Sequence, residues 1–354
     1  MVIELWILIW ILILGAIVWG VLLWRDAHKW DTKWHGRENN NIIWSTSTSL
    51  WLLDELRAQW VLQSTAWSIS LRVDPTMIVH PHVRIVATLL SQTIIGQPMF
   101  VVLMLLGLCS GKHVLIQSVP GLAKTTAVKT LATLTKLSLG RIQWTPDLLP
   151  SDITGYERML PDGSSIFQPW PLFHQLILCD EINRTTPKVQ SALIQAMQEW
   201  QVTVWTNTYD LPQPFLVFAT ANPTGSKWVY TLPEAQLDRF WLCIYVDYPD
   251  NEQSIVGSKT MRDALNQDCI IDLISRKQAI DDIHIDDNLI HYITTIIQTT
   301  RTLPWVSIGC SPRAGQDLVV LAKTWSWLQG KTQVTYSDID CLIQPVLWHR
   351  IVRK

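Results

Sequence analysis

One stretch of the chain combines proline, glycine, lysine and threonine in an order that suits phosphate binding. It lies between an apolar run typical of a buried strand and a helix predicted over 125–137. A turn in that position can direct backbone N–H groups at an anionic phosphate. Lys124 would then reach two phosphates, and the Thr125 hydroxyl would bind Mg²⁺. The candidate phosphate-binding residues are Pro120, Gly121, Leu122, Ala123, Lys124, Thr125 and Thr126.

This match is weak when taken alone. The strict phosphate-loop pattern has glycine at two positions where this chain has Ser118 and Ala123. A chance strand, turn and helix with a surface lysine is therefore an alternative that the stretch by itself leaves open.

Acidic residues follow a second apolar run. Asp180 and Glu181 come directly after 176–179. Ligands of parallel α/β sheets bind at the carboxyl ends of the strands. Asp180 would hold Mg²⁺ there, together with Thr125, and Glu181 would orient and polarise an attacking water. The alternative is a helix N-cap followed by an acid in the first turn.

A third apolar run, 215–219, leads into Thr220, Ala221 and Asn222. This places a polar amide at the same predicted edge of the sheet. Its alternative is a turn residue before Pro223.

The elements that must position these residues alternate between helices and short apolar strands. The predicted strands are 114–116, 176–179, 215–219 and 242–246, and the predicted helices are 125–137 and 187–199. Short apolar strands separated by helices indicate a parallel sheet covered on both faces. After Pro249 the pattern is mainly helical, which predicts an α/β domain followed by a helical one.

The N-terminal segment predicts a membrane anchor. Residues 5–24 carry no charge, and tryptophans lie towards both ends of the segment. Lysines and arginines follow it, so the positive-inside rule places the rest of the chain in the cytoplasm. We therefore expect a single-pass membrane protein. A cleaved signal peptide would need a basic start and a small-residue cleavage site, which the segment lacks.

The polar stretch after the anchor is typical of a linker, and 49–78 has the apolar spacing of one amphipathic helix. Charged residues make up 16% of the 354 residues, and the net charge is -2. Because nucleic-acid binding needs clustered Lys and Arg, no nucleic-acid partner is expected.

Several segments, in order, resemble the MoxR family of AAA+ ATPases. They are 121–125, 141–155, 180–184, 190–193, 232–240, 311–314 and 345–350. The resemblance extends over roughly 92–350. In this family Ala123 is expected, whereas Ser118 departs from the pattern.

The resemblance implies an AAA+ P-loop core with a parallel sheet and a C-terminal helical lid. The predicted domains are a transmembrane anchor (1–24), a linker with the amphipathic helix (25–80), the α/β core (81–250) and the lid (251–354).

The resemblance also implies roles for single residues. Asn222 matches the sensor that positions the attacking water, Arg239 the arginine finger given to a neighbouring subunit, and Arg313 the second sensor on the lid. With Glu181, these form the predicted catalytic set. The alternative for both arginines is a surface ion pair. ATP and Mg²⁺ are the implied cofactors, and a trans finger implies a homo-oligomeric ring, usually a hexamer.

The function implied is that of a membrane-anchored ATP hydrolase that remodels or matures a protein client in a chaperone-like way. A partner with a von Willebrand A domain is possible by family analogy. Hairpins are expected over 156–168 and 200–212, either facing the client or as plain surface hairpins. The alternative function is a catalytically weakened nucleotide-binding scaffold at the membrane.

Tryptophans argue for that alternative, together with Ser118. They stand where the family tends to have Gly, at Trp170, Trp205 and Trp228, or Arg, at Trp200 and Trp348. Glycine is used where φ is positive or the backbone approaches closely. An indole there predicts strain or an exposed apolar patch.

Overall fold

The computed structural model describes residues 73–118, 122, 124–161, 165–222, 230, 232–246 and 273–354. The chain divides into two units, Met1–Val61 and Leu62–Lys354, and every described residue belongs to the second. The predicted anchor, the linker and most of the predicted amphipathic helix lie outside the described residues.

The prediction of a membrane-spanning fold is corrected. In the part of the chain that the structure describes, no helix is both long and apolar enough to cross a membrane. The longest described helix, α12 (Pro312–Leu328), has 17 residues and carries Arg313, Asp317 and Lys323. The more apolar α4 (Pro98–Ser110) has 13, too few for a ~30 Å hydrocarbon layer. The single-pass localisation is corrected with it, and 5–24, which carried both predictions, lies outside the described residues.

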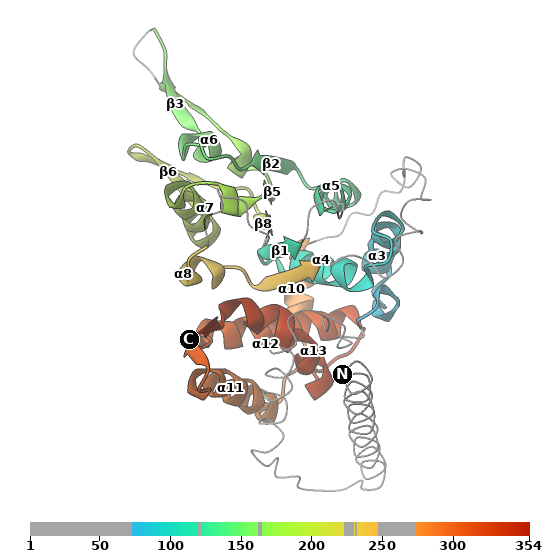
Figure 1. Ribbon diagram of the computed structural model, residues 1–354. Coiled ribbons are helices and arrows are strands. Elements are labelled where there is room, and N and C mark those ends of the chain that lie inside the picture. Colours follow the sequence, from blue (N-terminus) through green and yellow to red (C-terminus); the bar gives the residue numbers. More distant parts are fainter. Residues whose placement is uncertain are drawn as a thin grey trace, which may run out of the picture. The chain divides into compact units, whose positions relative to one another are not determined.

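A five-stranded sheet forms the centre of the core, with the strand order β2-β5-β8-β1-β9 (Figure 1). Its strands are β1 (Val114–Ser118), β2 (Leu139–Gln143), β5 (Leu176–Asp180), β8 (Leu216–Ala221) and β9 (Leu242–Val246). Every neighbouring pair is parallel. The predicted parallel α/β core with a helical lid is confirmed.

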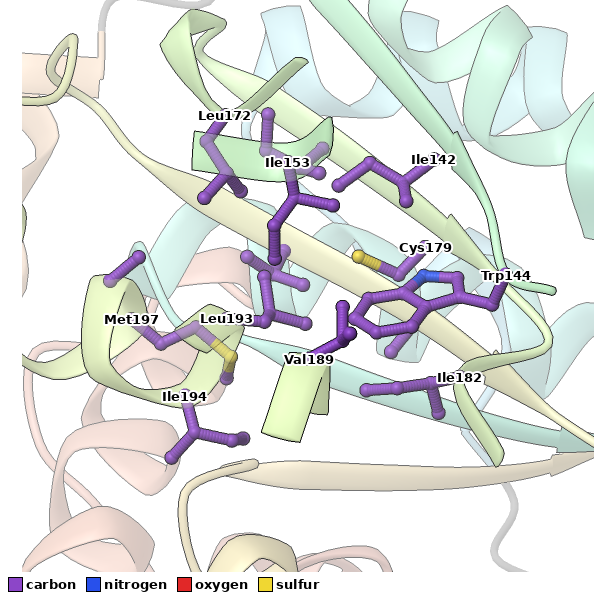
Figure 2. Close-up of a cluster of buried hydrophobic side chains, with 14 of the residues drawn as sticks. Ile142, Trp144, Ile153, Leu172, Cys179, Ile182, Val189, Leu193, Ile194 and Met197 are labelled. Atoms are coloured by element: carbon purple, nitrogen blue, oxygen red, sulfur yellow. The ribbon is translucent and has the colours of Figure 1, made fainter. Parts of the chain in front are cut away.

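Helices pack on this sheet because the strands are apolar on both faces. The core helices are α3 (Pro81–Thr93), α4, α5 (Lys124–Thr135), α6 (Ser151–Thr154), α7 (Pro187–Glu199) and α8 (Glu234–Leu237), with short 3-10 turns η1 (Pro75–Met77), η2 (Pro171–Phe173) and η3 (Ile182–Arg184). Alternate strand residues, such as Leu115, Ile177 and Val217, belong to the core cluster that includes Val189 and Leu193 of α7. Figure 2 shows Val189 of α7 next to Trp144, with Leu193, Ile194 and Met197 further along the helix.

The lid is helical, as predicted, with one short strand pair. Its elements are α10 (Leu273–Asp281), α11 (Asp287–Thr302), β10 (Val306–Ile308), α12, α13 (Tyr336–Leu347), η5 (Trp348–Arg350) and β11 (Val352–Arg353). β10 and β11 pair antiparallel, which the sequence did not indicate.

Two hairpins extend the core, as predicted. They are β3 (Tyr156–Met159) with β4 (Ser165–Gln168), and β6 (Gln201–Val204) with β7 (Asn207–Asp210). Glu157 joins them, since its Oε1 accepts from Asn207 Nδ2 at 2.6 Å and from the Tyr209 hydroxyl at 3.2 Å. The turn of the second hairpin lies at Trp205 and Thr206, and residues 162–164 of the first hairpin lie outside the described residues.

Two of the unusual tryptophans occupy backbone positions that favour glycine. Trp200, after α7, has φ 54°, and Trp205, in the β6–β7 turn, has φ 56°. Trp170 and Trp348 do not, with φ of -125° and -54°. The expectation of strain at family glycine positions is therefore confirmed at Trp205 and wrong at Trp170. Trp200, which stands where the family has Arg, has positive φ without having been expected to, and Trp228 lies outside the described residues.

Trp205→Gly is expected to raise the free energy of unfolding by about 0.5–1 kcal/mol, because the left-handed conformation costs an L-residue more than it costs glycine. The side chain is 85% exposed, so little packing is lost. Urea unfolding measures the effect. Trp170→Gly is the matched control and should lower stability, since its backbone is extended. Equal shifts of both variants in one direction would contradict the explanation.

Candidate active site

The carboxyl ends of three neighbouring strands bring the predicted site residues together. β8 pairs with both β1 and β5, so Ser118, Asp180 and Asn222 lie at the same edge of the sheet. α5 begins at Lys124, directly after the loop that follows β1. In that loop, Pro120, Gly121 and Ala123 lie outside the described residues, while Leu122 is buried and Thr126 is an exposed residue of α5.

Asp180 is the centre of this edge. Its Oδ2 accepts from the Thr125 hydroxyl at 3.1 Å, and its Oδ1 accepts from the Thr220 hydroxyl at 3.0 Å. Arg141, on the adjacent strand β2, forms an ion pair with Oδ2 at 3.0 Å. The two predicted metal ligands, Thr125 and Asp180, are therefore in direct contact.

Lys124 places its ammonium group over the end of β1. Its Nζ donates to the Ser118 carbonyl oxygen at 3.3 Å. Burial lowers the pKa of Lys124, and the nearby carboxylates Asp180 and Glu181 oppose that shift. A cation held between a strand end and two carboxylates is well placed to bind an anion that carries its own divalent metal.

Ser118 is an ordinary strand residue. It pairs with Val246 of β9 at the end of β1 and is buried. It is not among the described non-glycine residues with positive φ. Serine at this position therefore causes no backbone strain that glycine would relieve.

Glu181 is held in an uncommon conformation. Its φ of 64° lies in the left-handed region, which non-glycine residues occupy mainly where surrounding contacts enforce it, often at functional sites. Its backbone N–H donates to the Thr220 hydroxyl at 2.8 Å, and its Oε2 forms an ion pair with Arg184 Nε at 3.0 Å. The carboxylate of Glu181 thus has a defined position beside Asp180.

Asn222 follows β8 and is partly exposed. Its backbone oxygen accepts from Asn183 Nδ2 at 2.9 Å, which fixes the end of β8 against the segment after Glu181. The structure therefore brings together Lys124, Thr125, Asp180, Glu181 and Asn222 at one edge.

The two predicted catalytic arginines lie elsewhere. Arg239 and Arg313 line one pocket of about 180 Å³ together with Lys112, Gln198 and Trp241. The pocket adjoins the amino ends of β1 and β9, where the Trp241 N–H donates to the His113 carbonyl oxygen at 3.0 Å. With its amide oxygen turned to the guanidinium, Gln198 accepts from Arg239 Nε at 2.8 Å.

This pocket and the Asp180 edge lie at opposite ends of the sheet strands. β1 has five residues, so the two are separated by about 16 Å along the strand at roughly 3.3 Å per residue. Arg239 and Arg313 therefore lie far from the Lys124 site of their own chain.

The residues at the Asp180 edge fit a Mg²⁺–nucleotide. A hydroxyl and a carboxylate are hard oxygen ligands, and magnesium usually binds one or two such groups with phosphates and waters. Among the described residues, no group of three or more His, Cys, Asp or Glu residues could hold a metal. The phosphates of a nucleotide would supply the remaining ligands.

Sequence reasoning missed three residues of this edge: Arg141, Thr220 and Arg184. Thr220 directly follows the apolar run of a predicted strand. Its hydroxyl, at the carboxyl end of that strand, could have indicated a site residue. Arg141 lies on an edge strand that was not predicted, and its contact with Asp180 depends on the pairing of β2 with β5.

Comparison with known proteins places the chain among ATPases. The family model described as "ATPase family associated with various cellular activities (AAA)" matches residues 113–242, and the model described as "AAA lid domain" matches residues 298–354.

Relatives of known name align over most of the chain. Chaperone MoxR1 of Mycobacterium tuberculosis is 37% identical over 277 residues, which cover 74% of this chain and 73% of the relative. The uncharacterised protein YeaC of Bacillus subtilis is 36% identical over 283 residues, which cover 77% of this chain and 88% of the relative. A crystal structure of a protein from Cytophaga hutchinsonii that is described as an ATPase superposes with a TM-score of 0.71 at 35% identity. The match covers 77% of this chain and 88% of that structure.

Proposed function

Because the chain belongs to the MoxR family of AAA+ ATPases, we propose that it hydrolyses ATP with Mg²⁺ in a ring of identical subunits and uses the energy to change the conformation of a protein client. One observation carries the proposal. Lys124, Asp180 and Glu181 gather at one edge of the sheet, while Arg239 and Arg313 share a pocket at the other.

The first edge binds the nucleotide of its own chain. Lys124 contacts the β- and γ-phosphates, and Thr125 with Asp180 holds the metal. Mg²⁺, when bound, neutralises charge on the phosphates. Glu181 orients and polarises the attacking water, and Asn222 positions that water from the end of β8. Thr220 holds both Asp180 and Glu181 in place.

The second edge serves the nucleotide of a neighbouring subunit. A guanidinium about 16 Å away along the strand cannot reach its own γ-phosphate. Head-to-tail packing of identical subunits brings opposite edges together and closes into a ring. Arg239 then stabilises the charge of the transition state in the adjacent site. The shared pocket supports the same direction of action for Arg313.

The client is a protein in this proposal, because one relative is named a chaperone. A partner with a von Willebrand A domain fits the family resemblance and is proposed on that basis. The scaffold alternative loses one argument, since Ser118 is extended and unstrained.

Steady-state release of inorganic phosphate from ATP by the purified full-length chain, with Mg²⁺ or with EDTA, tests the function. We expect turnover on the order of 1–10 s⁻¹ with Mg²⁺ and none with EDTA. In Lys124→Ala we expect turnover to be lost, because the phosphates lose their cation. ATP binding without turnover in the parent chain would instead favour the scaffold, and equal turnover in Lys124→Ala would contradict the assigned site.

A further inference from the structure

The last turn of the lid contacts the core on both sides of Arg239. The Nε2 atom of His349, in η5, lies 2.9 Å from the carbonyl oxygen of Phe240. Arg350 donates from Nη2 to the same oxygen at 2.9 Å, and its Nη1 lies 3.5 Å from Asp238 Oδ1. The residues before and after Arg239 are therefore both held by the last turn of the lid.

The same guanidinium binds the helix that carries Arg313. Arg350 Nη2 donates to Asp317 Oδ2 at 2.6 Å, and both side chains are only 1% exposed. Asp317 lies on α12, four residues after Arg313. Ser311, at the start of α12, donates to Asp238 at 3.1 Å to one carboxylate oxygen and 3.2 Å to the other. Arg350, Asp238, Asp317 and Ser311 thus form one cluster, here called the lid latch.

Stability alone does not explain this cluster. A buried ion pair loses hydration about as much as it gains attraction, so apolar residues of similar size would hold the lid equally well. Burial in fact raises the pKa of Asp317 to about 6, against the opposing effect of Arg350. What a planar guanidinium does provide is direction, because its N–H groups form a rigid fork.

The fork sets the spacing between the two catalytic arginines. Its Nη1 lies beside Asp238, and its Nη2 donates both to the Phe240 carbonyl oxygen and to Asp317 of α12, so one guanidinium joins the two elements. Arg239 and Arg313 lie in the two elements so joined and line one pocket. A shift of either element by about 1 Å would misplace a guanidinium against a γ-phosphate, which can cost about 10²-fold in rate.

We propose that Arg350 is a positioning residue that, through Asp238, the Phe240 carbonyl and Asp317, holds Arg239 and Arg313 in register for the nucleotide of the neighbouring subunit. This rests on the proposed function. Arg350 itself contacts no nucleotide, so its loss should act through the arginines that it positions.

Arg350→Lys tests the proposal in the full-length chain. Lysine keeps the charge but cannot hold two carboxylates and a carbonyl in one plane. We expect kcat for ATP to fall by about 10–10²-fold with KM changed by less than about threefold. Lys331→Met is the matched control. It breaks another ion pair with a buried carboxylate, Lys331 Nζ to Asp338 Oδ1 at 2.7 Å, within the lid, and should lower stability with kcat nearly unchanged.

Mixed rings separate positioning from general damage. Arg350→Lys subunits keep an intact Lys124 site, and Lys124→Ala subunits keep an intact latch. Co-expressed, they should show more turnover than either alone, because some Lys124 sites then receive a well-placed Arg239. Arg239→Ala with Lys124→Ala is the reference mixture. If the reference fails, the trans finger and this inference are both overturned. If the reference recovers and the Arg350→Lys mixture does not, the latch alone is overturned.

Ser311→Ala provides a second measurement should Arg350→Lys fail to fold. It removes both hydrogen bonds to Asp238 and leaves the Arg350–Asp317 pair in place. We expect a fall in kcat of about 3–10-fold, with recovery of the turnover per intact Lys124 site in the same mixture. An unchanged kcat in Ser311→Ala, or a loss without recovery, would overturn the proposal.

Discussion

Glu181→Gln is expected to lower the turnover number for ATP by about 10²–10⁴-fold, the range for removing a general base. Glutamine keeps the size of the side chain but cannot polarise a water. The backbone of Glu181, with φ 64° and its N–H bonded to Thr220, is unaffected by the change. Affinity for ATP should stay within about threefold, since the proposal assigns the phosphates to Lys124 rather than to Glu181.

Single-turnover hydrolysis and equilibrium nucleotide binding measure these two effects. Glu157→Gln is the control, because Glu157 lies in the β3–β4 hairpin and bonds to Asn207 rather than to the site. Its turnover should equal that of the parent. Loss of binding in Glu181→Gln, or turnover above about a tenth of the parent, would remove Glu181 from its proposed role.

The contrast with Lys124→Ala strengthens this test. Lys124 has its Nζ over the end of β1 and contacts the phosphates in the proposed function, so its loss should weaken ATP binding itself. Glu181, beside Asp180, orients the attacking water in the same proposal. Two variants at one edge of the sheet are thus expected to fail at different steps, which a general loss of folding could not reproduce.

The central strands were predictable because they are continuous apolar runs. β5 and β9 match their predicted ranges at nearly every residue. β2 was missed because Gly140, Arg141 and Gln143 interrupt its apolar pattern, and burial there alternates along an edge strand. Because β2 was missed, the contact between Arg141 and Asp180 was missed as well, since no local sequence pattern indicates it.

The left-handed tryptophans show what local reasoning can achieve. Positions where the family has glycine were predicted to be strained, and Trp205 indeed has positive φ, whereas Trp170 is extended. Trp200 also has positive φ, although it stands where the family has arginine. The location of Arg313 shows the limit. Whether it reaches the nucleotide of its own chain depends on how α12 packs on the core, and that packing is set by distant residues such as Asp238 and Arg350.

Arg239→Ala and Arg313→Ala are each expected to reduce ATP turnover by about 10³-fold, the lower end of the range for a finger residue. The pocket that both arginines line lies at the amino ends of the strands, away from Asp180. Both should therefore act on a neighbour. Phosphate release by each variant, compared with the parent at saturating ATP, measures the loss.

Mixed rings decide whether each arginine acts in trans. In a random equal mixture with Lys124→Ala, about a quarter of the interfaces join an intact Lys124 site to an intact arginine, because heterologous packing gives each site one donor neighbour. Turnover should recover to about a quarter of the parent for both variants. An arginine that acts on the nucleotide of its own chain cannot be replaced by the arginine of a neighbour. Recovery with Arg239→Ala but not with Arg313→Ala would therefore mean that Arg313 acts in cis. The lid would then have to pack differently when ATP is bound.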